Sequence, residues 1–221
     1  RSNELEIAAT GLEPETFLTG EAGWRYTAAQ STFTATAYYT RIRDFITSTP
    51  TGRLNAGLTE VSKQNSARGF VQGVELAASH HWLSGISAWG NLTWLEGRLR
   101  ATQPGAANRT PREALSRIMP LTFNFGLSWR DDLDRWHAAL DVAIVAKADH
   151  LSPGDRADTQ RIPPGGTPAY ETATLSFGKR LSHQFELDVG LTNLFNARYR
   201  THGSGVNAGG RGIDVRLTAS F

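Results

Sequence analysis

Hydrophobic and polar residues alternate with a period of two along most of this chain. The clearest example is the last segment, residues 211–221. Its apolar positions are Ile213, Val215, Leu217, Ala219 and Phe221, and its polar positions are Asp214, Arg216, Thr218 and Ser220. This period places the two sets on opposite faces of a half-buried β-strand. A strand at the end of a chain leaves an unpaired edge, which closure into a barrel removes.

The same alternation predicts about nine strands. They cover residues 15–29, 31–47, 66–82, 86–100, 117–130, 135–149, 169–181, 184–196 and 211–221. Tight turns near residues 29–30, 83–85, 131–134 and 181–183 alternate with long loops at 48–65, 101–116, 150–168 and 197–210. Short turns at one end and long loops at the other are typical of outer-membrane barrels. We therefore predict an all-β, antiparallel, up-and-down transmembrane β-barrel, with residues 1–10 in a further loop.

Periodicity alone fits two environments equally, since the apolar faces suit either lipid or the core of a soluble protein. The aromatic residues favour lipid, because they gather near the strand ends, as they do at membrane interfaces. Those near the tight turns are Trp82, Trp129, Trp136, Phe185 and Phe221, and those near the long loops are Phe70, Tyr170, Phe195 and Tyr199. Arg41 and Arg43 occur late on an apolar face, and we expect them to contact anionic head groups.

Composition narrows the function classes. The 221 residues include no cysteine, which excludes a disulfide framework and cysteine–metal sites. The chain contains no run of about 18 apolar residues, so a membrane-spanning helix is not expected. The net charge of +2, without a long basic run, gives no electrostatic indication of nucleic-acid binding. The chain begins with Arg1 and shows no signal peptide, so we expect a mature product or a fragment.

Several motifs, in order, resemble those of one family. They are Leu12-Glu13-Pro14-Glu15 with Glu21-Ala22-Gly23, Gly73-Val74-Glu75-Leu76 after Arg68-Gly69-Phe70, Arg117-Ile118-Met119-Pro120, and Asn193-Leu194-Phe195-Asn196 through Tyr199-Arg200, followed by Gly210-Arg211 and the terminal strand. Together they are similar to the late barrel strands of TonB-dependent outer-membrane receptors. The resemblance extends over almost the whole chain.

The resemblance implies that residues 1–221 are the C-terminal segment of a barrel of about 22 strands, without the plug domain and the earlier strands. It implies location in the bacterial outer membrane and TonB-dependent uptake of a metal chelate, such as an iron–siderophore, or of a similar scarce nutrient. The expected partners are outer-membrane lipids, the plug with the remaining strands, TonB acting through the plug, the barrel-assembly machinery, which would read Phe221 as its signal, and the small-molecule ligand. Neither enzymatic activity nor a cofactor is implied.

The candidate ligand contacts are His150, Arg156, Arg161 and His202, because they occur in or beside long loops. Catalytic sites find little support. The adjacent His80 and His81 point to opposite faces of a strand and cannot chelate one metal together. A triad built on Asp149-His150 lacks the G-x-S-x-G elbow.

Two other function classes stay open. One is an outer-membrane barrel of another type, such as an adhesin or a lipid-modifying enzyme, which an upstream sequence without a plug would favour. The other is a soluble β-sandwich binding module, which solubility without detergent would favour.

Overall fold

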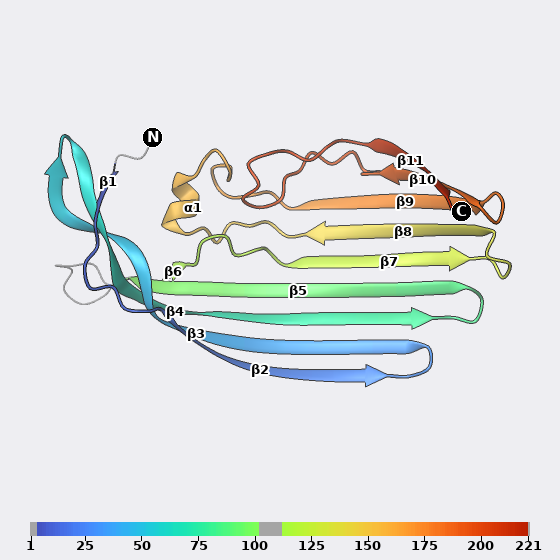
Figure 1. Ribbon diagram of the computed structural model, residues 1–221, viewed down its shortest axis with the longest axis horizontal. Coiled ribbons are helices and arrows are strands. Elements are labelled where there is room, and N and C mark those ends of the chain that lie inside the picture. Colours follow the sequence, from blue (N-terminus) through green and yellow to red (C-terminus); the bar gives the residue numbers. More distant parts are fainter. Residues whose placement is uncertain (1–3, 102–111, 221) are drawn as a thin grey trace.

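The computed structural model describes residues 4–101 and 112–220 and is built almost entirely of strands (Figure 1). The long strands are β2 (Thr16–Thr27), β3 (Ser31–Asn55), β4 (Leu58–His81), β5 (Ile86–Ala101), β7 (Thr122–Arg130), β8 (Trp136–Val145), β9 (Tyr170–Arg180), β10 (Phe185–Thr192) and β11 (Gly212–Ala219). Each pairs antiparallel with the next in chain order, from β2 to β11. Three short elements complete the fold: β1 (Glu4–Ile7), β6 (Glu113–Ala114) and α1 (Pro153–Ala157).

The predicted all-β, antiparallel fold is confirmed, and each of the predicted strands is present. The prediction of a loop at residues 48–65 was wrong. β3 and β4 continue through this region as one long hairpin that turns at Ala56 and Gly57, both with positive φ. The missed signal is the run of Thr, Ser and Val, which favours strands. Both faces of this hairpin carry polar residues, so the alternation that marks the other strands is absent there.

Other boundaries also differ from the prediction. β7 begins at Thr122 rather than at residue 117, β8 ends at Val145, and β10 ends at Thr192. Positive φ values at Arg117, Asn193 and Asn196 break the extended backbone there. Residues 1–10 were expected to form a loop, but β1 pairs in parallel with β4. The predicted loops at 101–116 and 150–168 contain β6 and α1 respectively.

The pairing register confirms the assignment of side chains to two faces. One row across the sheet joins Ala88, Leu127, Leu140, Leu175, Leu191 and Ile213. We call this side the apolar face. The opposite, polar face carries cross-strand hydrogen bonds such as Asn124 to Asn91, 2.9 Å, and Thr32 with Ser79, 2.7 Å. Since successive side chains of a strand point to opposite sides of the sheet, every long strand from β2 to β11 contributes residues to both the apolar and the polar face.

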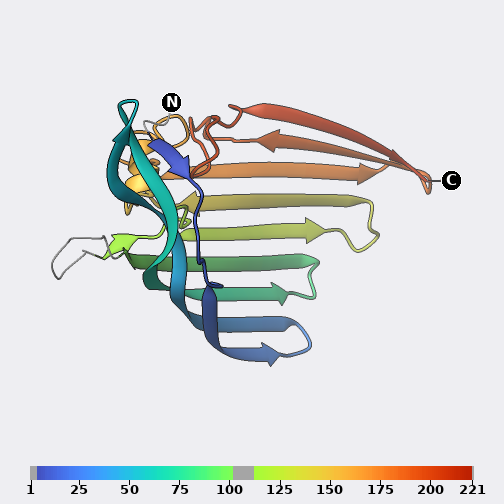
Figure 2. The same ribbon diagram turned by 60° about the vertical axis from the view of Figure 1, so that its left-hand side comes forward.

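The apolar face has no second sheet against it in the part of the chain that the structure describes. Leu127, Ile213 and Leu217 are 50%, 70% and 62% exposed. Buried apolar side chains, among the described residues, are few: Ile42, Val61, Ala67, Val145, Ala148, Ile162 and Ala173. A β-sandwich requires two sheets packed about 10 Å apart, so the described strands do not form one. The sheet is curved and open, with β2 and β11 at its edges (Figure 2).

Among residues 4–101 and 112–220, no helix has the length and apolarity needed to cross a membrane.

Candidate functional site

The long connections between β5 and β7, β8 and β9, and β10 and β11 meet at one end of the sheet (Figure 1). We call residues 112–121, 146–169 and 193–211 the loop cap. The tight turns lie at the opposite end of the strands. The loop cap contains every ligand-contact residue predicted from the sequence.

The single helix of the loop cap has a strong local start signal. Ser152 is its N-cap and accepts a hydrogen bond from the Asp155 backbone, 3.0 Å, while the Asp155 side chain accepts one from the Ser152 backbone, 3.3 Å. Pro153 occupies the first turn, where its missing N–H costs nothing. This reciprocal capping box fixes the helix and leaves the Asp155 carboxylate facing the protein.

Asp155 is the centre of the loop cap and is only 2% exposed. Its carboxylate accepts hydrogen bonds from the Ser116 hydroxyl, 2.6 Å, and from the Arg117 backbone, 3.3 Å. Burial opposes ionisation, but the hydrogen bonds from Ser116 and Ser152 outweigh it and hold the Asp155 pKa below its ordinary value. This carboxylate therefore joins α1 to the segment that leads into β7.

Arg117 completes this network from a left-handed backbone conformation, φ 64°. Its guanidinium pairs with Asp158 and lies 3.6 Å from Asp155. One terminal nitrogen, Nη1, is buried and has no hydrogen-bond partner among the described residues. Gly203 packs against it, and a Cβ at that position would lie 2.7 Å from Nη1. The connection between β10 and β11, which contains Gly203, is therefore packed around the Arg117 side chain.

His202 was predicted to contact ligand, and the structure places it inside the loop cap. It is 9% exposed, and its Nδ1 lies 2.9 Å from the Thr167 hydroxyl. Burial lowers its pKa, an effect reinforced by Arg117 and opposed by Asp155. Burial therefore favours the neutral imidazole. Its contact with Thr167 joins the connection between β10 and β11 to the connection between β8 and β9.

A cleft of about 770 Å³ opens between the end of β5 and the loop cap. His150, Arg156 and His202 line it, while Arg161 does not and instead faces Asp158. The His150 side chain is 90% exposed and lies 3.1 Å from Asp149. Arg156 donates to the Leu151 carbonyl, 2.6 Å. Three of the four predicted residues thus converge on one cleft, where they offer cationic and imidazole groups.

Asp155, Arg117 and Ser116 were not among the predicted residues, although they organise the cleft. The signal for Asp155 was present in the sequence, since Ser152-Pro153-Gly154-Asp155 fits a capping box with proline in the first turn. Nothing local indicates the partners Ser116 and Arg117, which lie 39 and 38 residues away.

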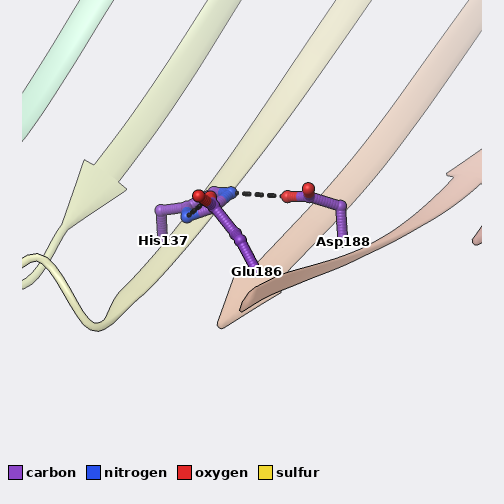
Figure 3. A group of neighbouring side chains, drawn as sticks. All are labelled: His137, Glu186 and Asp188. Carbon is purple, nitrogen blue, oxygen red and sulfur yellow. Dashed lines mark hydrogen bonds and ion pairs between the residues drawn. The ribbon is translucent and has the colours of Figure 1, made fainter. Parts of the chain in front are cut away.

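A second group of charged side chains lies on the polar face near the tight turns (Figure 3). His137 of β8 reaches across β9 to Asp188 of β10, with Nε2 2.9 Å from Oδ1, while its Nδ1 lies 3.7 Å from Glu186. Gly178 of β9 makes this possible, because a Cβ there would overlap both His137 and Asp188. One imidazole and two carboxylates suit a divalent cation. However, each imidazole nitrogen already faces a carboxylate, so the group also satisfies itself.

Several of the aromatic residues named from the sequence lie at or beside strand ends, whereas Phe70 lies in the middle of β4 because that strand extends to Leu58. Trp129 precedes the turn after β7, and Trp136 opens β8, where its ring lies 5.3 Å from Phe177 and 4.2 Å below Lys179 Nζ. Trp82 follows β4 and Phe185 opens β10. At the loop end, Tyr199 stacks on Tyr170 at 4.3 Å. Phe195 follows the end of β10, and Phe221 lies outside the described residues.

Comparison with known proteins gives one family match. The model of the TonB dependent receptor-like β-barrel matches residues 2–194. No curated protein sequence matches the chain.

Solved structures share the fold. The copper transporter OprC has a TM-score of 0.74 at 20% identity, over 96% of this chain and 32% of its own. The FrpB iron transporter from Neisseria meningitidis has a TM-score of 0.75 at 16% identity, over 99% and 34%. A mutant of the ferric enterobactin receptor PfeA from Pseudomonas aeruginosa has a TM-score of 0.66 at 21% identity, over 96% and 32%. The chain therefore spans about a third of the length of these structures.

Proposed function

The chain belongs to the TonB-dependent receptor family, and on that premise we propose that it forms the C-terminal wall of an outer-membrane receptor that imports a metal chelate. Members of this family are transport proteins rather than enzymes. The wall would contribute lipid-facing surface, part of the lumen lining and several extracellular loops. The remaining strands and the plug domain would come from the rest of such a receptor.

The exposed rows of the apolar face carry this proposal. Leu127, Leu175 and Ile213 lie in one row and are 42–70% exposed, with polar side chains on the reverse of the same sheet. At about 25 cal/mol per Å² of apolar surface, such a face is costly in water and favourable in hydrocarbon. Lipid on one side and a wet lumen on the other satisfy both faces.

The open edges support the need for further strands. In hydrocarbon each unpaired backbone group costs several kcal/mol, and both β2 and β11 end the described sheet. Bacterial outer-membrane barrels of a single chain have an even number of strands. The long strands of the described sheet, from β2 to β11, are odd in number, which suits part of a larger barrel. The plug would then fill the lumen and connect the receptor to TonB.

The loop cap suits the extracellular side, because long loops face outward and short turns face the periplasm in this class of barrel. Its cleft brings together His150, Arg156 and His202. Cationic donors favour anionic oxygen groups, such as those on the surface of a metal chelate. OprC, FrpB and PfeA are named for copper, iron and ferric enterobactin, which supports a metal-containing cargo for this receptor.

Uptake by the whole receptor tests the proposal. In cells that lack other importers of the chelate, we expect the receptor to support TonB-dependent accumulation of a radiolabelled ferric or cupric chelate. Replacing both His150 and Arg156 with Gln should weaken binding about tenfold, because these side chains are exposed and the two together are worth roughly 1.4 kcal/mol once solvent screening is included. Arg200→Gln is the matched control, because Arg200 pairs with Asn207 and does not line the cleft. Uptake that persists without TonB would refute the proposal.

Membrane insertion is tested separately. We expect the receptor to fractionate with the outer membrane and to migrate differently on denaturing gels before and after heating. Deleting Phe221 should lower the amount assembled, because we propose that the terminal aromatic residue is read by the barrel-assembly machinery. Full assembly of this truncated receptor would argue against that role.

A further inference from the structure

Arginines gather on the apolar face at the loop end of β3, β4 and β5. Arg41, Phe70 and Arg98 form one row of directly opposed residues, and Arg68 lies directly opposite Arg100. Arg43 follows Arg41 on the same face. A groove of about 690 Å³ is lined by these five arginines together with Tyr39, Phe70 and Arg112. We call it the arginine groove.

The positive charge of the arginine groove is poorly balanced within the described residues. Arg98 is paired with Glu96 at 2.6 Å, and Glu96 also accepts from Gln72 at 2.8 Å. No ion pair or side-chain hydrogen bond holds Arg41, Arg43, Arg68 or Arg100 within residues 4–101 and 112–220. Among the residues that the structure describes, Asp44 is the only acidic one that lines the groove. Like charges directly opposite each other on neighbouring strands are destabilising, so an anion that bridges them would be stabilising.

The groove changes character toward the middle of the sheet. Tyr39 and Phe70 stack at 5.6 Å directly beside the arginines. On the same face Tyr39 lies opposite Gln72, and Gln72 opposite Glu96. The next row toward the middle of the sheet is apolar, with Ala37 opposite Val74 and Val74 opposite Trp94. A free inorganic anion would use the basic half alone. A molecule with phosphate at one end and acyl chains at the other would contact both halves.

We propose that the arginine groove binds the phosphorylated head group of a lipid in the outer leaflet, with its acyl chains along the apolar face. Guanidinium groups suit this role because their planar donors bind phosphate oxygens in pairs. The stacked Tyr39 and Phe70 rings lie at the boundary between head group and chain, where aromatic rings are favoured. This inference rests on the proposed orientation of the apolar face toward lipid.

Lipid binding by the whole receptor tests the groove. The receptor is purified in neutral detergent, stripped of lipid, and titrated with bisphosphorylated lipid A while bound lipid is counted by native mass spectrometry. Each arginine near a membrane surface contributes about fivefold to the binding of anionic lipid, so Arg68→Gln with Arg100→Gln should weaken binding roughly thirtyfold. Replacing both with Lys should preserve most of the binding. Arg53→Gln is the matched control, because Arg53 is exposed on the same hairpin but outside the groove.

Competition experiments distinguish a lipid phosphate from free inorganic phosphate as the ligand of the groove. Dephosphorylated lipid A should bind at least tenfold more weakly to the native receptor, and millimolar inorganic phosphate should not displace the lipid. Equal binding of both lipid forms, unchanged binding by the double Gln variant, or displacement by inorganic phosphate would each overturn the inference. A receptor that binds lipid A through these arginines but fails to import any chelate would contradict the proposed cargo and leave the lipid site standing.

Discussion

Asp155→Asn is the most informative single change, because the carboxylate is 2% exposed and holds α1 against the segment before β7. Asparagine keeps the shape but removes the charge that faces Arg117. It also turns an amide toward backbone N–H groups that need an acceptor. Leaving a buried donor without its acceptor costs about 1–3 kcal/mol, and more where the acceptor is charged. The strands lie outside this network, so the loss should be confined to the loop cap.

Hydrogen exchange measured by mass spectrometry on the whole receptor provides the assay. Since each 1.4 kcal/mol changes an equilibrium tenfold, exchange in peptides that cover residues 150–162 should accelerate by about fivefold to a hundredfold. Peptides from β3 and β4 should be unchanged. Asp149→Asn is the control, because that acid lies in the same connection but is partly exposed, beside Lys147 and His150. Exchange within threefold of the native rate in the Asp155 variant would refute the central role of this carboxylate.

Three further predictions concern single positions. Gly203→Ala should destabilise the loop cap by about 1–3 kcal/mol, because Gly203 has φ 77° and a Cβ would press on Arg117. The loss of stability is measured as the rate of protease cleavage in the connection between β10 and β11. Cleavage at the native rate would contradict this prediction. The His202 pKa is lowered from 6.5, so the contribution of His202 to stability is complete above pH 6.5 and is lost as the pH falls below that value toward the folded-state pKa. Hydrogen exchange of the loop cap should therefore accelerate on acidification in the native receptor and not in His202→Gln. Identical pH profiles of the two proteins would exclude this residue as the cause. Gly178→Ala should lower the urea midpoint of unfolding, because the methyl group overlaps His137 and Asp188, whereas Gly190→Ala on the same face meets only an ordinary contact at 3.8 Å; equal midpoints for the two variants would show that the group around His137 adds no stability.

Alternation made the strands and their faces predictable, because it is a local property. Side chains two residues apart share a face in any strand, so rows such as Leu140 opposite Leu175 follow once the hairpins are recognised. The tight turns were also visible in the sequence, and together they fixed neighbour order. The long hairpin of β3 and β4 was missed, because polar residues on both of its faces remove the periodic signal.

The sequence by itself determined an antiparallel sheet with one apolar face, its order of strands and the end at which the long loops lie. It also supplied the motif order that identified the family. Only the tertiary structure decided what the loops build. Asp155 with Ser116, Arg117 against Gly203, and Thr167 with His202 meet across 35 or more residues. Arg68 and Arg100 meet on the neighbouring strands β4 and β5. The loop contacts arise because strand pairing brings distant connections to one end of the sheet, and no local pattern encodes which side chains then meet.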